Sequence, residues 1–547
     1  MKKTLNILAV AFMAVAAVAC SSAEKMAKEA ENVKVTCDPA VLELVGGEIN
    51  PTVTVTYPQG YFNPKAVLEV TPVIVYEGGE EAMAPLYYQG EKVKDNNKVV
   101  AKDGDTVTEK LHFTYKPGME KCYLELRGVA TVKSKSANLP TKKVADGLNT
   151  TCLLVDQNGK ISYKADSYQE FIPQTEEGQI LYTINSSDVR GKELKSQSIK
   201  DFQTALDEIK DNERKTLKGT EIVAYASPDG GESLNSKLSD KRATSAEKVW
   251  GKVVKGHEAT DPEVKSIGQD WEGFQDLVSK SNIDDKDLIL RVLSMYSDPA
   301  VRESEIKNMS EVYKELKGGV LPELRRARFI ANVEYKNYTN EELMTLIEQN
   351  SDVLDEEALL RVASLVNDPD KKIEVYNKAI NKFGSERAKF NKGVANLEKG
   401  NVAAAEAAFA ACDKADADVK NAEGVIALRK GDLQKAISSF KAAGTKDAQT
   451  NLGIANVLAG NYAEAEQNFA CTEYGCDKAV ALLVNNKLDA AEAALKCDCP
   501  KSNYVRAIIA ARKGNNAAAK SYLEKATTAC PELAKRAATD IEFAGLN

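Results

Sequence analysis

The first part of the chain alternates apolar and polar residues in short runs. The runs at residues 52–57, 106–115 and 122–132 place an apolar side chain at about every second position. Because successive side chains of a strand point to opposite faces, this period predicts half-buried antiparallel strands. Turn signals such as Pro58-Gln59-Gly60 separate the runs. The pattern predicts a β-sandwich over residues 24–160.

In the next part of the chain, strand-like runs alternate with helical spacing. An apolar run at 180–185 precedes apolar residues three to four positions apart around Phe202. A second run at 222–225 precedes a helical stretch over about 236–249. This strand–helix–strand–helix order predicts an α/β domain over residues 161–336.

The predicted α/β domain also contains a long stretch of a different kind. Residues from about 251 to 319 include at least two amphipathic helices, which predicts a helical insertion. A last strand is predicted at 325–333, where arginines lead an alternating run.

The last part, residues 338–547, repeats a pattern of small and aromatic positions. A glycine is followed seven residues on by a second glycine, five later by an alanine and four later by a phenylalanine. Such a period predicts a solenoid of paired helices. The clearest copies are Gly393, Gly400, Ala405 and Phe409; Gly424, Gly431, Ala436 and Phe440; and Gly453, Gly460, Ala465 and Phe469. Two weaker copies follow, around Ala491 and Ala519.

These positions resemble the tetratricopeptide repeat, with turns clipped to spacings of 31, 29, 26 and 28 residues. The resemblance implies that small residues let paired helices approach and that the aromatic ring fills the gap between them. It also implies an all-α domain that recruits envelope proteins. The alternative, that the array only spaces or caps its neighbour, stays open because no basic or aromatic stripe marks a peptide site.

A second resemblance concerns residues 221–243. A strand leads into a glycine-containing loop and then into Asn235, Leu238-Ser239 and Arg242-Ala243. This spacing resembles the ligand loop of the OmpA-like peptidoglycan-binding domain. The strand–helix order and the closing arginine strand extend the resemblance to roughly a third of the chain.

In that family, a loop aspartate takes the ammonium of diaminopimelate and a helix arginine takes its carboxylate. The match places Arg242 at the arginine, whose planar fork suits a carboxylate because it donates two parallel bonds. The loop aspartate corresponds to Ser227, which cannot neutralise an ammonium, and Asp229 lies two residues on. The peptidoglycan-binding residues that the resemblance implies are Ser227, Asp229, Asn235 and Arg242.

The start of the chain has the layout of a secretory signal, with two lysines before an apolar run at 8–19. Val18-Ala19-Cys20 resembles a lipobox, which implies a lipoprotein signal peptide at 1–20 and acylation of Cys20, for example by palmitate. The run is shorter than the roughly 20 residues of a spanning helix. Ser21-Ser22 in place of an aspartate favours the outer membrane, and we expect a lipid anchor facing the periplasm.

Charge and motif content exclude several classes of function. The net charge is −8 without a basic block, which argues against nucleic acid as a partner. The only histidines, His112 and His257, lie in different predicted domains, and no GxSxG, Walker or HExxH pattern occurs. We therefore expect no enzyme activity, no catalytic residue and no cofactor.

Six of the ten cysteines lie in the predicted repeats. Cys471 and Cys476 form one close pair and Cys497 and Cys499 another, but neither pair has the two-residue spacing of a zinc knuckle. Small buried side chains or local disulfides are favoured over zinc at these positions. The spacing therefore predicts no metal site.

Two functions remain open. In the first, a lipoprotein tethers the outer membrane to peptidoglycan and recruits envelope proteins through its repeats. In the second, the chain is a surface or periplasmic scaffold or adhesin whose OmpA-like domain has lost its wall ligand, as Ser227 suggests.

Overall fold

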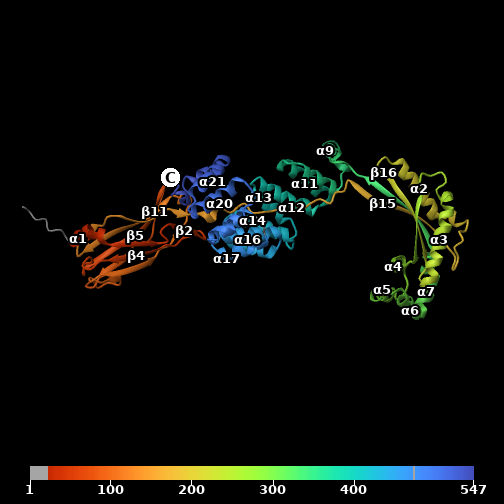
Figure 1. Ribbon diagram of the computed structural model, residues 1–547, viewed down its shortest axis with the longest axis horizontal. Coiled ribbons are helices and arrows are strands. Elements are labelled where there is room, and N and C mark those ends of the chain that lie inside the picture. Colours follow the sequence, from red (N-terminus) through yellow and green to blue (C-terminus); the bar gives the residue numbers. More distant parts are fainter. Residues whose placement is uncertain (1–21, 472–474, 547) are drawn as a thin grey trace, which may run out of the picture. The chain divides into compact units, whose positions relative to one another are not determined.

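The computed structural model describes residues 22–471 and 475–546 (Figure 1). These residues form two compact units. Unit 1 comprises the described residues of Met1–Lys164 together with Asp368–Asn547, and unit 2 is Ala165–Asn367. Unit 1 is therefore made of two separate stretches of the sequence.

The first stretch of unit 1 is rich in strands, as predicted. Three sheets have the strand orders β1-β4-β9, β10-β3-β2-β14 and β12-β11-β5-β7-β8, with β13 and β6 added to the third. Its elements are α1 (Ser22–Glu29), β1 (Lys34–Asp38), β2 (Leu42–Val45), β3 (Glu48–Ile49), β4 (Thr52–Tyr57), β5 (Ala66–Tyr76), β6 (Gly79–Ala82), β7 (Leu86–Gly90), β8 (Lys98–Val100), β9 (Asp105–Lys110), β10 (Phe113–Thr114), β11 (Cys122–Val132), β12 (Lys135–Asn138), β13 (Lys142–Asp146) and β14 (Leu148–Asn149).

Two of these sheets share one apolar core. Tyr57 and Val107 of the β1-β4-β9 sheet pack with Leu68, Tyr88 and Ala130 of the largest sheet. Most strand pairs are antiparallel, as the alternation predicts, but β2 with β14 and β7 with β8 are parallel. The prediction of antiparallel strands was therefore wrong for these two pairs.

The second stretch of unit 1 is helical and contains the repeats. Its helices are α11 (Pro369–Phe383), α12 (Glu386–Glu398), α13 (Val402–Ala410), α14 (Ala417–Arg429), α15 (Leu433–Ala443), α16 (Lys446–Leu458), α17 (Tyr462–Asn468), α18 (Cys476–Val484), α19 (Leu488–Ala493), α20 (Pro500–Arg512), α21 (Asn516–Ala529) and α22 (Pro531–Ala537). Each repeat consists of two adjacent helices, such as α14 and α15.

The glycine–phenylalanine pattern has the predicted structural cause. A Cβ added at Gly393, Gly424 or Gly453 would lie 2.4–2.6 Å from the ring of Phe409, Phe440 or Phe469. The small residue therefore makes room for the ring of the neighbouring helix. The second glycine of each copy has a positive φ at the turn between the two helices, for example 78° at Gly431.

The sheet β10-β3-β2-β14 and the repeats form one continuous core. Leu42, Phe113 and Leu148 belong to the same buried cluster as Val457 and Phe469. The contact is close, since a Cβ on Gly46 would lie 2.9 Å from the carbonyl oxygen of Ala459. The two stretches of unit 1 consequently stabilise each other.

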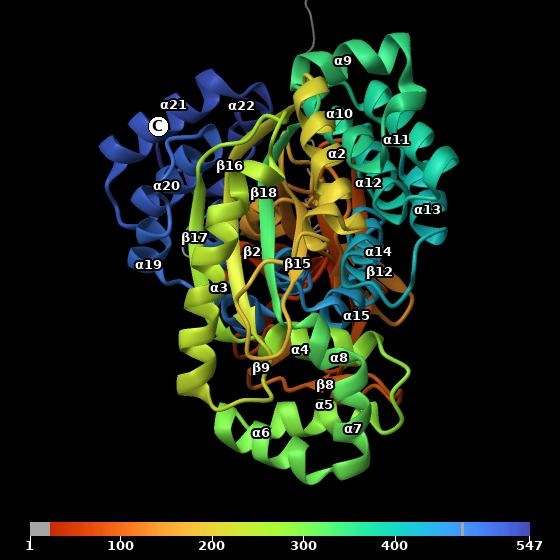
Figure 2. The same ribbon diagram turned by 90° about the vertical axis from the view of Figure 1, so that its right-hand side faces the viewer.

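Unit 2 is an α/β fold with the sheet order β15-β18-β16-β17. Figure 2 shows α2 and α3 on one face of this sheet, where Phe202, Trp250 and Phe329 form the core. The elements are β15 (Phe171–Leu181), α2 (Gln197–Asp211), β16 (Lys215–Ala226), α3 (Glu232–Val253), β17 (Pro262–Gln269), α4 (Trp271–Lys280), α5 (Lys286–Met295), α6 (Pro299–Asn308), α7 (Ser310–Gly318), α8 (Val320–Glu323), β18 (Arg326–Lys336), α9 (Asn340–Gln349) and α10 (Glu356–Leu365).

The predicted insertion at about 251–319 begins too early. Its first part contains β17, which pairs in parallel with β16 and is part of the sheet. The inserted helices are α4–α8, and they enclose a small core of their own around Phe274 and Leu316. The strand escaped prediction because Val264 is its only strongly apolar residue before Ile267.

Among the described helices, none combines the length and the apolar character that a membrane crossing requires. Cys20 and the predicted signal peptide lie outside the described residues.

Candidate functional site

The loop between β16 and α3 brings together three of the four predicted site residues. Asn235 lies in the first turn of α3, is buried, and donates from Nδ2 to the carbonyl oxygens of Ser227 (3.0 Å) and Gly230 (2.6 Å). Its side chain therefore closes the loop from inside. The cap of the helix is Gly231, so Asn235 is not the N-cap.

Asp229 is paired within the protein. Its carboxylate accepts from Nη2 of Arg325 at 3.0 Å and from the Ser227 hydroxyl. The side chains of Arg325 and Asp229 are 12% and 11% exposed. Arg325 also donates from Nε to the Ser227 hydroxyl at 3.3 Å. The charge that a ligand ammonium would need is thus already neutralised by an arginine.

Arg242 is buried, with 1% of its surface exposed. Its guanidinium donates to the carbonyl oxygens of Tyr225 (2.9 Å), Ser186 (3.0 Å) and Thr183 (3.3 Å), and it lies 5.0 Å from the ring of Tyr182. Burial lowers the pKa of Arg242 to about 10. This arginine joins the end of β16 to the loop after β15, so a ligand carboxylate would have to compete with three backbone carbonyls.

A second buried ion pair lies next to this loop. Arg326 donates from Nη2 and Nε to Asp270 at 2.8 and 3.1 Å, and the Asp270 side chain is 3% exposed. Asp270 also caps α4 by accepting from the backbone of Gly273. Sequence reasoning identified these arginines as a strand signature but predicted no partners, because Asp270 is 56 residues away.

In unit 1, three asparagines of successive repeats bind the chain itself. Asn391, Asn421 and Asn451, here called the asparagine row, lie on the first helices α12, α14 and α16. All three are buried. They contact residues 156–164, here called the connecting segment, which run along α16, α14 and α12 (orange trace in Figure 1).

Two members of the row bind the backbone of one residue with both ends of the amide. Asn451 accepts from the N–H of Lys160 at 2.6 Å and donates to its carbonyl at 2.7 Å. Asn391 does the same at Lys164, at 2.7 and 2.9 Å. Asn421 donates to the Lys160 carbonyl at 3.1 Å. This geometry recognises an extended backbone rather than particular side chains.

Side chains of the connecting segment add contacts with the same helices. The Tyr163 hydroxyl donates to Glu398 at 2.6 Å, and the Ser162 hydroxyl donates to Asp447 at 2.6 Å. Lys164 pairs with Asp416. The asparagine row was missed by sequence reasoning, although its spacing of 30 residues is visible in the sequence.

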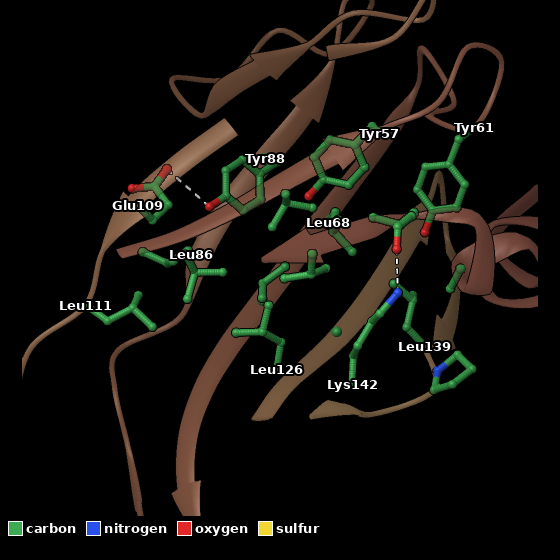
Figure 3. Close-up of a pocket in the computed structure, with 18 residues that line it drawn as sticks. Tyr57, Tyr61, Leu68, Leu86, Tyr88, Glu109, Leu111, Leu126, Leu139 and Lys142 are labelled. Carbon is green, nitrogen blue, oxygen red and sulfur yellow. Dashed lines mark hydrogen bonds between the residues drawn. The ribbon is translucent and has the colours of Figure 1, made fainter. Parts of the chain in front are cut away.

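A cavity lies between the sheets of the strand-rich region (Figure 3). Its volume is about 70 Å³, and its walls are mainly apolar, including Leu68, Leu86 and Leu126. The Tyr88 hydroxyl donates to Glu109 at 3.2 Å. The buried Tyr61 hydroxyl has no hydrogen-bond partner among the described residues. The sequence analysis did not predict this cavity.

Comparison with known proteins supports the repeat assignment. The family model described as tetratricopeptide repeat matches residues 500–533, which contain the weak copy around Ala519. No curated protein matches the chain.

Solved structures of low identity resemble part of the chain. A tetratricopeptide repeat protein from Parabacteroides merdae is 12% identical and covers 37% of this chain and 91% of its own, with a TM-score of 0.31. PilF of Pseudomonas aeruginosa is 14% identical over 35% of this chain and 97% of its own, with a TM-score of 0.30. A Thermus thermophilus tetratricopeptide repeat protein is 17% identical over 34% and 98%, with a TM-score of 0.22. At these scores the likenesses carry no argument about function.

Proposed function

We propose that this chain is a non-enzymatic protein-interaction scaffold of the bacterial cell envelope, anchored in the outer membrane by a lipid on Cys20. Tetratricopeptide-type repeats are a protein-binding architecture, which supports a scaffold. The β15–α2–β16–α3 order and the arginine-led strand β18 support an OmpA-like fold for unit 2. In this proposal unit 2 no longer binds peptidoglycan.

One observation supports the proposal that unit 2 does not bind peptidoglycan. Arg242 and Asp229, the two charges that would hold diaminopimelate, are both engaged inside the protein, by three backbone carbonyls and by Arg325. Removing Arg325 from Asp229 without a replacement would leave a largely buried charge unpaired, which costs about 3–5 kcal/mol.

The tether remains the second candidate because Ser227, Asp229 and Asn235 meet in one loop beside Arg242. A ligand bearing both an ammonium and a carboxylate would replace Arg325 at Asp229 and bind Arg242. In that function the same protein links membrane, wall and envelope partners.

Sedimentation with isolated sacculi separates the two candidates. The chain from residue 22 onward is mixed with sacculi and pelleted, and we expect it to stay in the supernatant. The tether would be established instead if the chain pelleted and Asp229→Asn abolished the pelleting. The control is Asp276→Asn, which changes an exposed aspartate of the same unit paired with Lys280 and should still pellet. Arg242→Ala is unsuitable here because losing a buried arginine disturbs folding as well as binding.

The lipid anchor has its own test. Cys20→Ser should abolish incorporation of labelled palmitate and move the protein from the membrane fraction to the soluble fraction. Incorporation that persists in this variant would contradict the anchor.

A further inference from the structure

Three thiols from two different turns of the repeat domain meet at one point. Cys476 is the first residue of α18, and Cys497 and Cys499 lie in the turn before α20. The sulfurs of Cys476 and Cys499 are 3.8 Å apart, those of Cys497 and Cys499 are 3.0 Å apart, and all three lie within 4.8 Å of one another. Within the described residues, no other three cysteine, histidine or carboxylate side chains converge in this way.

A buried hydroxyl faces the three sulfurs. Ser502 is fully buried in the first turn of α20, and its Oγ lies 3.1 Å from Cys476, 2.8 Å from Cys497 and 3.3 Å from Cys499. Cys497 is exposed, whereas Cys476 and Cys499 are half-buried. The cluster thus has a closed side at Ser502 and an open side through which an ion can enter.

Two of the three thiols lie at helix N-termini. Cys476 is the first residue of α18 and Cys499 is the N-cap of α20, and the first N–H groups of a helix have no partner within it. Thiolates at helix N-termini are stabilised by these groups.

We propose that Cys476, Cys497 and Cys499 bind one soft divalent cation of the zinc class as three thiolates. Three protons leave when the three Zn–S bonds form, and an oxygen donor fills the fourth position. Thiolate donors select zinc over magnesium or calcium. The site joins the start of α18 to the start of α20, and it is independent of the loop in unit 2.

The sulfur separations fit this ion. Tetrahedral zinc with Zn–S bonds of about 2.3 Å holds its sulfurs about 3.8 Å apart, which is the separation of Cys476 and Cys499. Cys497 must move less than about 1 Å away from Cys499 to reach the same spacing, and its exposed side chain is free to do so. A disulfide would use only two of the three sulfurs and needs them about 2.05 Å apart.

Metal content of the full chain tests the proposal. The chain is purified under reducing conditions without a metal-affinity step, dialysed against Zn²⁺ and then against buffer, and analysed by mass spectrometry for zinc. We expect about one zinc per chain, falling to about a tenth or less in Cys476→Ser and Cys499→Ser. The control Cys530→Ser, which removes a partly exposed thiol outside the cluster, keeps its zinc. Cys471, whose side chain lies outside the described residues, is retained in every variant.

A second measurement does not depend on the variants folding. Co²⁺ added to the unaltered chain should give sulfur-to-cobalt charge-transfer absorption and the strong visible bands of tetrahedral coordination, both displaced by Zn²⁺. A chain that takes up no zinc or cobalt overturns the proposal. So does a mass that shows a disulfide among these three cysteines after purification under reductant.

Discussion

Single glycines determine how closely the repeat helices pack. A Cβ at Gly424 would lie 2.4 Å from the Phe440 ring, so the ring or the helix would have to shift. We expect Gly424→Ala to lower the free energy of unfolding of unit 1 by about 1–3 kcal/mol, because the ring and the helix must move apart. Urea unfolding followed by circular dichroism measures this. In the control, Gly251→Ala in α3, the added Cβ meets nothing within 4 Å, and an equal loss there would contradict the packing argument.

Arg242 shows what residue-level sequence reasoning can reach. Its position was singled out by its spacing from Asn235, but its partners are carbonyls 17, 56 and 59 residues away. Spacing within one segment can indicate that a residue has a specific role, but it does not predict which atoms the side chain contacts. The pairing of Asp229 with Arg325, 96 residues apart, could not be predicted for the same reason.

Arg242 should therefore contribute to stability. We expect Arg242→Met to lower the free energy of unfolding of unit 2 by about 2–4 kcal/mol, since it leaves three carbonyls without their donor. The same urea experiment on this variant checks the value. A variant as stable as the parent would contradict the structural role of Arg242 and favour a role in ligand binding.

Whole elements were predicted best where the pattern was long and periodic. The repeat helices and the strand-rich region are confirmed, and both contribute their periodic apolar residues to one buried core. β17 was missed because Lys265, Gly268 and Gln269 interrupt the alternation of apolar and polar residues. The strand forms through its pairing with β16, which its own sequence does not predict. The spacing of the asparagine row is visible in the sequence, but its role could be recognised only from the segment that it binds.

The asparagine row should hold the connecting segment in place. We expect Asn391→Ala together with Asn451→Ala to free residues 156–164, because four backbone hydrogen bonds are lost. Limited proteolysis should then cut within this segment at least about tenfold faster, which corresponds to a loss of roughly 1.4 kcal/mol or more in the free energy of docking. The control Asn516→Ala removes an exposed asparagine at the start of α21, and faster cutting there would contradict the assignment.

The docked segment should also respond to acid. Burial by itself raises the pKa of Asp416, but hydrogen bonds from Lys164 and the Asp418 backbone hold this pKa below its usual range overall. A carboxyl group whose pKa is lower in the folded than in the unfolded state stabilises the folded state at pH values above its unfolded pKa. This stabilisation is lost as the pH falls through the pKa of the folded state. Hydrogen exchange of residues 156–164, corrected for its intrinsic rate, should accelerate below about pH 4. Asp416→Asn should remove this acceleration, and unchanged acid sensitivity in that variant would assign it to another group.

At the level of the whole molecule, unit 1 is assembled from both ends of the sequence. The connecting segment leaves the repeats beside α11, where Tyr163 stacks on Tyr376 with ring centroids 6.4 Å apart and lies under Lys372. The two points at which the chain leaves and re-enters unit 1 are thus close to the same helix. In the sequence, unit 2 is accordingly an insertion into unit 1, and the core of unit 1 is formed by residues of unit 1.

This arrangement predicts opposite results for two deletions. Replacing residues 165–367 by a short glycine–serine linker should leave unit 1 folded, with a single cooperative melting transition. The apolar core that Leu42 shares with the repeats lies within unit 1 and is retained in this protein. Ending the chain at residue 367 should instead expose the apolar side chains of β2 and β10 that the repeats cover, and the strand-rich region should melt earlier or aggregate. Circular dichroism and size-exclusion chromatography of both proteins measure this. A strand-rich region equally stable without the repeats would show that the shared core contributes little, and would make the two stretches of unit 1 separate domains.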